Sequence, residues 1–174
     1  MLRLETPRLV LRPPRAEDAP AIQAIASLRE VAEMTAAIPH PYPEGGALAF
    51  IESLEQPSAD GPDYHVVLER RIDGAVIGMA GLFPNPQGAH GQLGYYVDPA
   101  HWRRGYATEA AGRLVQYAFE QLGLDRLTAH VFVGNDASMR VLTKLGFVAQ
   151  GEFATDEPPR GPRRVALFER RRTP

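Results

Sequence analysis

The stretch GYYVDPAHWRRGYATE at residues 94–109 most strongly limits the folds open to this chain, because a strand-like aromatic segment runs through Pro99 into a basic helix start. The first N–H groups of a helix have no partner within the helix, so small residues there allow an anion such as a phosphate to approach. Gly105 permits a positive φ, and Arg103 and Arg104 add positive charge. The stretch therefore predicts an anion-binding turn, although an ordinary helix start with two solvated arginines has the same local sequence.

The segments that follow this turn predict a strand, a long helix and a second strand. Apolar residues recur at helical spacing from Ala107 to Leu122, and Gly123 is placed to end that helix. Residues 126–133 read as the next strand, so a right-handed crossover with parallel pairing is expected. Asn135 and Asp136 are good N-cap residues for a further helix, which Gly146 ends.

The remaining segments predict a mixed arrangement of strands and helices. Expected strands lie at residues 8–12, 64–70, 75–83, 90–97, 147–153 and 164–169, and expected helices at about 16–34 and 47–54. Asp73-Gly74 is a hairpin signal, and irregular connections are expected at residues 37–46, 56–62, 84–89 and 157–162. This order implies an α/β or α+β three-layer domain.

Size and charge further limit the classes of protein to which this chain can belong. With 174 residues and 44% hydrophobic residues, the chain is long enough for one core, so residues 1–174 are expected to form a single domain. A formal charge of −2 gives no bulk attraction to nucleic acid or an anionic membrane. The absence of cysteine excludes thiolate ligands and disulfides, and no apolar run approaches the ~20 residues that span a bilayer. A cytoplasmic protein is expected.

Three motifs in order resemble the GNAT superfamily of acetyl-CoA-dependent N-acetyltransferases. They are ETPRLVLR at residues 5–12, GYYVDPAHWRRGYATEA at residues 94–110, and NDASMRVLTKLGF at residues 135–147. Within the superfamily the chain looks most like the ribosomal-protein N-terminal acetyltransferases of the RimJ and RimL type. The family's pyrophosphate loop begins with Gln or Arg, whereas Trp102 stands at that position here. No GK[ST] or GxGxxG pattern supports a competing nucleotide-binding fold.

The resemblance implies a fold and a cofactor. The expected fold has a mixed central sheet of about six to seven strands, helices on both faces, and a splayed parallel pair at the cofactor cleft. Acetyl-CoA is the implied cosubstrate, without a metal, and the strand at residues 94–97 would offer backbone groups to its pantetheine arm. The implied cofactor-binding residues are Tyr96, Val97, Arg103, Arg104, Gly105, Tyr106, Ala107, Thr108, Asn135 and Ser138.

Amide formation from a thioester needs a neutral amine, a stabilised oxyanion and a proton for the departing thiolate. By the resemblance, Ser138 supplies the proton, while a first-turn helix serine bonded to the backbone is the alternative. The backbone N–H of Val97 is the expected oxyanion donor. The general base is not evident: the candidates are Glu33, His40, His65 and His90, each equally readable as a surface group.

The sequence thus predicts an acyltransferase that moves an acetyl group directly to a primary amine in a ternary complex. The acceptor is either a protein N-terminal α-amine or a small-molecule amine. A non-catalytic acyl-CoA sensor or adaptor that retains the cofactor cleft is the alternative. Tyr42, Tyr95 and Tyr96 either wall the acceptor channel or belong to the core. The basic residues Arg160, Arg163, Arg164 and Arg170 to Arg172 are expected to be solvated, nucleic acid is not an expected partner, and both monomer and homodimer stay open.

Overall fold

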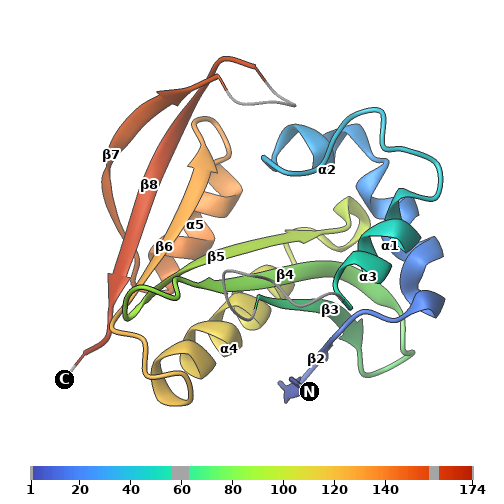
Figure 1. The fold of residues 1–174 in the computed structure, drawn as a ribbon, viewed down its shortest axis with the longest axis horizontal. Coiled ribbons are helices and arrows are strands. Elements are labelled where there is room, and N and C mark those ends of the chain that lie inside the picture. Colours follow the sequence, from blue (N-terminus) through green and yellow to red (C-terminus); the bar gives the residue numbers. More distant parts are fainter. Residues whose placement is uncertain (1, 56–62, 157–160, 174) are drawn as a thin grey trace.

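The computed structural model describes residues 2–55, 63–156 and 161–173, and within these ranges the strands form one mixed sheet (Figure 1). The eight strands of these ranges follow the order β1-β2-β3-β4-β5-β6-β8-β7. Their bounds are Leu4–Glu5, Leu9–Arg12, Tyr64–Arg70, Val76–Pro84, His90–Val97, Arg126–Phe132, Val148–Thr155 and Arg163–Arg171 for β1 to β8. The expected mixed sheet is confirmed. The prediction of six to seven strands missed β1, because two residues are too few to show alternation.

The helices fall on both faces of this sheet. They are η1 (Ala16–Asp18), α1 (Ala19–Ala26), α2 (Arg29–Glu33), α3 (Gly46–Ser53), η2 (Pro99–His101), α4 (Tyr106–Glu120) and α5 (Asp136–Lys144). The single helix predicted for residues 16–34 is wrong. The chain divides there because Ser27 Oγ donates to the Gln23 carbonyl at the end of α1, and Leu28 then takes an extended conformation before α2. The predicted irregular segment at residues 56–62 and the first four residues of the one at 157–162 lie outside the described residues.

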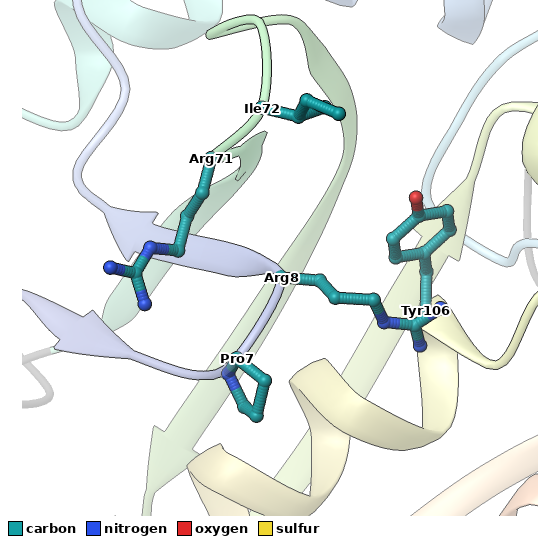
Figure 2. A pocket seen from close by; sticks show the side chains of 5 residues that line it. All are labelled: Pro7, Arg8, Arg71, Ile72 and Tyr106. Atoms are coloured by element: carbon teal, nitrogen blue, oxygen red, sulfur yellow. The ribbon is translucent and has the colours of Figure 1, made fainter.

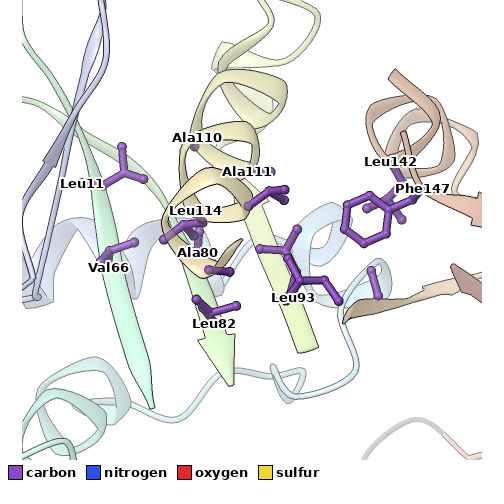
Figure 3. Close-up of a cluster of buried hydrophobic side chains, with 14 of the residues drawn as sticks. Leu11, Val66, Ala80, Leu82, Leu93, Ala110, Ala111, Leu114, Leu142 and Phe147 are labelled. Carbon is purple, nitrogen blue, oxygen red and sulfur yellow. The ribbon is translucent and has the colours of Figure 1, made fainter. Parts of the chain in front are cut away.

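The larger core lies between the sheet and α4 (Figure 3). Leu114 of α4 is fully buried, and Val66, Leu82 and Leu93 belong to the same cluster from three adjacent strands. A smaller cluster on the opposite face joins Ile22 of α1 and Ile51 of α3 to Val67 and Met79. Successive residues of a strand point to opposite faces, so the central strands contribute side chains to both clusters and the sheet is packed on both faces.

The strands β5 and β6 form the parallel pair, and they separate soon after they begin. They pair at His90↔Arg126, Gly91↔Leu127 and Gln92↔Thr128. Beyond that point β5 stays with β4 as far as Gly78↔Val97, while β6 stays with β8 as far as Phe132↔Val165. Figure 1 shows the two strands leaving a common start in different directions. The predicted splayed pair is therefore confirmed.

A buried ion network fastens the N-terminal segment to the sheet. The Arg12 guanidinium donates to both carboxylate oxygens of Asp18, at 2.7 and 2.9 Å, and to Glu69 of β3 at 2.6 Å. The Arg12 and Asp18 side chains are each only 8% exposed. Burial alone would raise the pKa of Asp18, but hydrogen bonds from Arg12 and from the Arg15 backbone hold it below its usual value.

We expect Arg12→Ala to lower the free energy of unfolding by about 3–5 kcal/mol, because two carboxylates would stay in the interior without their cation. Urea denaturation of the purified variant measures the change. Arg3→Ala is the control: the Arg3–Glu5 pair is 54% exposed on both sides, and its loss should cost at most about 1 kcal/mol. A loss from Arg12→Ala as small as that of the control would show that the network does not stabilise the fold.

Candidate active site

The turn between β5 and α4 has the backbone geometry of an anion-binding loop. Gly105 is the N-cap of α4 with a φ of 79°, and Arg103 also has a positive φ of 60°. The first hydrogen bond of the helix runs from Glu109 N to Gly105 O at 3.0 Å. The N–H groups of Tyr106, Ala107 and Thr108 precede it, and Gly105 has no side chain to cap them. A loop that leaves these donors for a ligand fits a phosphate group.

The edge of β5 that leads into this loop faces the place where β6 has departed. Asp98 N donates to Ile77 O and Asn85 N donates to His90 O, both at 2.8 Å, so even-numbered residues of β5 bond to β4. Since the direction alternates along an antiparallel strand, the N–H groups of Tyr95 and Val97 point toward the β6 side. These groups lie beyond the last paired residues of β5 and β6.

Trp102 connects the loop to that strand edge. Its indole Nε1 donates to the Val97 carbonyl at 2.7 Å, while the Asp98 carboxylate accepts from Ala100 N at 2.9 Å. The carbonyl of Val97 thus has a fixed partner. Trp102, which stands where the family usually has Gln or Arg, therefore has a structural role here: its indole N–H holds the last carbonyl of β5.

Ser138 lies at the start of α5, across the cleft end from β5. Its N–H donates to the Asn135 side chain at 3.2 Å, which caps the helix. Its hydroxyl lies 2.9 Å from the Tyr95 hydroxyl, and the Tyr95 hydroxyl also donates to the Ser138 carbonyl at 3.3 Å. Burial raises the pKa of Tyr95 to about 12, so this phenol stays protonated at neutral pH. The structure thus pairs Ser138 with Tyr95, which the sequence suggested either as a wall of the acceptor channel or as part of the core.

The four candidate bases are not brought to one place. Glu33 pairs with Arg29 of its own helix at 2.6 Å, and that pairing, with lesser contributions from Arg163 and His40, lowers its pKa. His40 is exposed in the loop before α3, and His90 lines a shallow pocket with Asn85 and Gln87.

His65 does not point into water, which was one sequence-based expectation for it. Its ring packs edge-on against Phe50 of α3 and Phe83 of β4, with centroid distances of 5.3 and 5.1 Å. A side chain at Gly81 would stand 2.4 Å from the Phe83 ring, so the glycine makes room for this aromatic group. Burial lowers the pKa of His65 and favours the neutral imidazole.

Tyr42 and Tyr96 pack against the small cluster beneath α1 and α3, as the core interpretation expected. Burial raises the pKa of both phenols.

The arginines of β8 have partners within the chain. Arg164 pairs with Glu152, Arg171 pairs with Glu169, and Arg170 donates to the Leu145 carbonyl. Arg163 lies over Phe132, Arg172 pairs with Asp125, and Arg160 lies outside the described residues.

Known proteins share this combination of fold and sequence. Residues 8–148 match the model of the acetyltransferase (GNAT) domain. The chain is 35% identical over 149 residues to the uncharacterized N-acetyltransferase YoaA of Bacillus subtilis (strain 168), which covers 85% of this chain and 84% of that protein. The chain therefore belongs to the GNAT family, and it is an N-acetyltransferase.

Solved structures share the fold at lower identity. A putative ribosomal-protein-serine acetyltransferase from Vibrio cholerae has a TM-score of 0.82 at 21% identity, with 98% of both chains covered. Mycobacterium smegmatis RimJ in complex with CoA-disulfide has a TM-score of 0.81 at 22% identity, covering 94% of this chain and 81% of that one. These neighbours show that the chain shares their fold. No helix of the described residues has the length and apolar character to cross a membrane.

Acetyl-CoA is the cosubstrate of GNAT acetyltransferases, and the geometry of this chain fits it. The first turn of α4 offers backbone donors at the turn where the sequence predicts an anion site, and the separated edge of β5 leaves N–H groups that fit an extended amide chain. Sequence patterns missed Arg8, which reaches the loop from the N-terminal segment, and the hydroxyl pair of Tyr95 and Ser138.

We expect Gly105→Glu to weaken acetyl-CoA binding by at least about tenfold, because it places a carboxylate beside the anion site and a Cβ at a positive φ. Gly123→Glu is the matched control. Gly123 has a φ of 68°, follows the other end of α4, and has open space around it. Calorimetric titration with CoA compares the two variants, and equal affinities would contradict the assignment of the loop.

Proposed function

We propose that this chain transfers the acetyl group of acetyl-CoA directly to a primary amine, in a ternary complex and without a covalent enzyme intermediate. The observation that carries the proposal is the Tyr95–Ser138 hydroxyl pair, which joins β5 to the start of α5 beyond the point where β5 and β6 separate. The pair supplies a proton donor for the departing thiolate, and the uncapped start of α4 supplies backbone donors for the pyrophosphate at the other end of the pantetheine arm. The acceptor is a protein N-terminal α-amine or a small-molecule amine.

Each proposed residue has a role that its contacts support. The amides of residues 104–108, with Arg103 and Arg104, bind the pyrophosphate, and Tyr96 and Val97 border the pantetheine arm. The Val97 N–H, turned away from β4, stabilises the oxyanion of the reacting carbonyl. Asn135 holds the start of α5, and Ser138 gives a proton to the departing sulfur.

Tyr95 supplies the proton that replaces the one Ser138 gives up. A phenol whose pKa is raised to about 12 keeps its proton at neutral pH, and the 2.9 Å contact lets it pass that proton to Ser138. The proton that the attacking amine loses goes to solvent, and Tyr95 takes one back from solvent, so the cycle closes without net change on the protein. An α-amine with a pKa of about 7.7–8.0 is partly neutral at physiological pH, so it needs less help from a base than a lysine with a pKa near 10.4. This difference favours an N-terminal or similarly weakly basic amine.

The names of one structural neighbour and one partial relative in sequence support a protein acceptor. The Vibrio cholerae structure is that of a putative ribosomal-protein-serine acetyltransferase, and a Bacillus subtilis protein that matches 46% of this chain is a putative ribosomal N-acetyltransferase. We propose by analogy that a peptide with a free N-terminus is the first acceptor to test.

Incubation with acetyl-CoA and an amine panel should release free CoA thiol. The panel holds peptides with a free α-amine, the same peptides with a blocked N-terminus and an internal lysine, and small primary amines. We expect release with at least one unblocked amine and none with the blocked peptides, because the lysine amine is protonated at pH 7. CoA binding without release across the panel would contradict the proposal and favour a non-catalytic acyl-CoA sensor.

Ser138→Ala should lower kcat by about 10²-fold, in the range of a lost general acid, while the affinity for CoA stays near that of the wild type. Thr143→Ala is the control on the same helix, because its hydroxyl donates to the Met139 carbonyl and is exposed. Steady-state kinetics and CoA titration of both variants measure the split. An unchanged kcat in Ser138→Ala would remove Ser138 from the mechanism.

A further inference from the structure

The N-terminal segment is attached to the start of α4 through Glu109. The Glu109 Oε1 atom accepts from Thr6 Oγ1 at 2.6 Å and from Arg8 N at 2.9 Å. Its Oε2 atom pairs with Arg8 Nε at 2.6 Å. The Glu109 side chain is 15% exposed, so these three donors hold a largely enclosed carboxylate across a sequence separation of about one hundred residues.

The same Arg8 side chain also reaches the pyrophosphate loop. Its Nη1 atom donates to the Arg104 carbonyl at 2.8 Å, and its guanidinium lies 4.4 Å from the centre of the Tyr106 ring. A Cβ added at Gly105 would stand 3.4 Å from its Nη2 atom. Arg8 thus touches three successive residues of the loop, and Figure 2 shows it extended toward Tyr106.

The hydrogen bond to Arg104 decides the orientation of one peptide group. In a trans peptide the carbonyl and the following N–H point in opposite directions, and the group is planar. With the Arg104 carbonyl turned toward Arg8, the N–H of Gly105 must point away from Arg8. Without this bond the peptide group could adopt other orientations, because Gly105 on its C-terminal side is free to take either sign of φ and has a φ of 79° here.

The opposite charges of Arg8 and Glu109 also connect Arg8 to anion binding at the loop. Glu109 belongs to the first turn of α4, close to a site for an anion. Burial alone would raise its pKa, but hydrogen bonds from Thr6 and Arg8 lower it, so the carboxylate is ionised at neutral pH. Arg8 neutralises this charge, which would otherwise repel a phosphate bound at the helix start.

We propose that Arg8 is a positioning residue for the donor substrate: it holds the Arg104–Gly105 peptide group and offsets Glu109, so that affinity for the pyrophosphate of CoA depends on it. This inference rests on the proposed function. Arg8 acts through the loop and through Glu109, so it should affect only ligands that carry the pyrophosphate.

The test compares three ligands on wild type and Arg8→Met: CoA, dephospho-CoA, which keeps the pyrophosphate but lacks the 3′-phosphate, and pantetheine, which lacks both. Methionine retains an apolar stem over Tyr106 and removes every guanidinium donor. By calorimetry or competition binding, we expect at least about tenfold weaker binding of CoA and dephospho-CoA, as for the loss of one charge-assisted hydrogen bond, and unchanged binding of pantetheine.

Arg71→Ala is the matched control. Arg71 lies beside Arg8 in the same pocket and donates to the Thr6 carbonyl, and no contact of its side chain with the loop is found in the described residues. We expect its three affinities to match the wild type. If Arg8→Met lowers the yield of folded protein, Arg8→Gln repeats the measurement, since glutamine is too short to reach both Glu109 and Arg104.

The outcomes separate the inference from the proposed function. Equal weakening of all three ligands by Arg8→Met would indicate a general structural role and overturn the inference, as would a loss confined to CoA. Wild-type discrimination between CoA and pantetheine that persists in Arg8→Met would also overturn it while leaving the proposed function intact. A wild type that binds CoA no better than pantetheine would overturn both.

Discussion

The separation of β5 from β6 is the constraint on which the rest of the structure depends. A sheet gains stability from paired backbone groups, so a strand edge without a neighbour must find other partners. Here β4 and β8 hold the two strands on their outer sides, and three pairs at the base keep them joined. The opening between them is therefore a permanent feature of the backbone, set by two well-paired halves of one sheet.

Polar contacts fix the side chains on both sides of this opening. Trp102 holds the Val97 carbonyl within the β5 wall, and the Asn135 cap holds Ser138 in the opposite wall. Tyr95 joins the two walls through its hydroxyl. The side chains along the opening are thus fixed by polar contacts, whereas His65 and its neighbours on the opposite face of the sheet are held by aromatic packing.

Much of this architecture could be predicted from the sequence because local signals agreed with the final fold. Strand 64–70 and strand 90–97 were predicted to the residue, and Gly105 marked the start of α4. Three features could not be predicted. The two-residue β1 is too short for a pattern, the break at Leu28 follows from a local side-chain bond, and the contacts of Arg8 with Glu109 and Arg104 join segments far apart in sequence. Motif order could place ETPRLVLR near the start, but only the packing of β2 beside α4 gives Arg8 its partners.

The link between Thr6, Arg8 and Glu109 has a consequence for how the site forms. The strand–helix–strand unit at residues 90–132 contains the loop, the splayed strands and the first turn of α4, yet it lacks the side chain that orients the loop. Bringing segments this far apart in sequence together costs conformational entropy, which the sheet that packs between them offsets. The donor pocket is thus a product of global folding, and an excised central fragment would carry its motif without its shape.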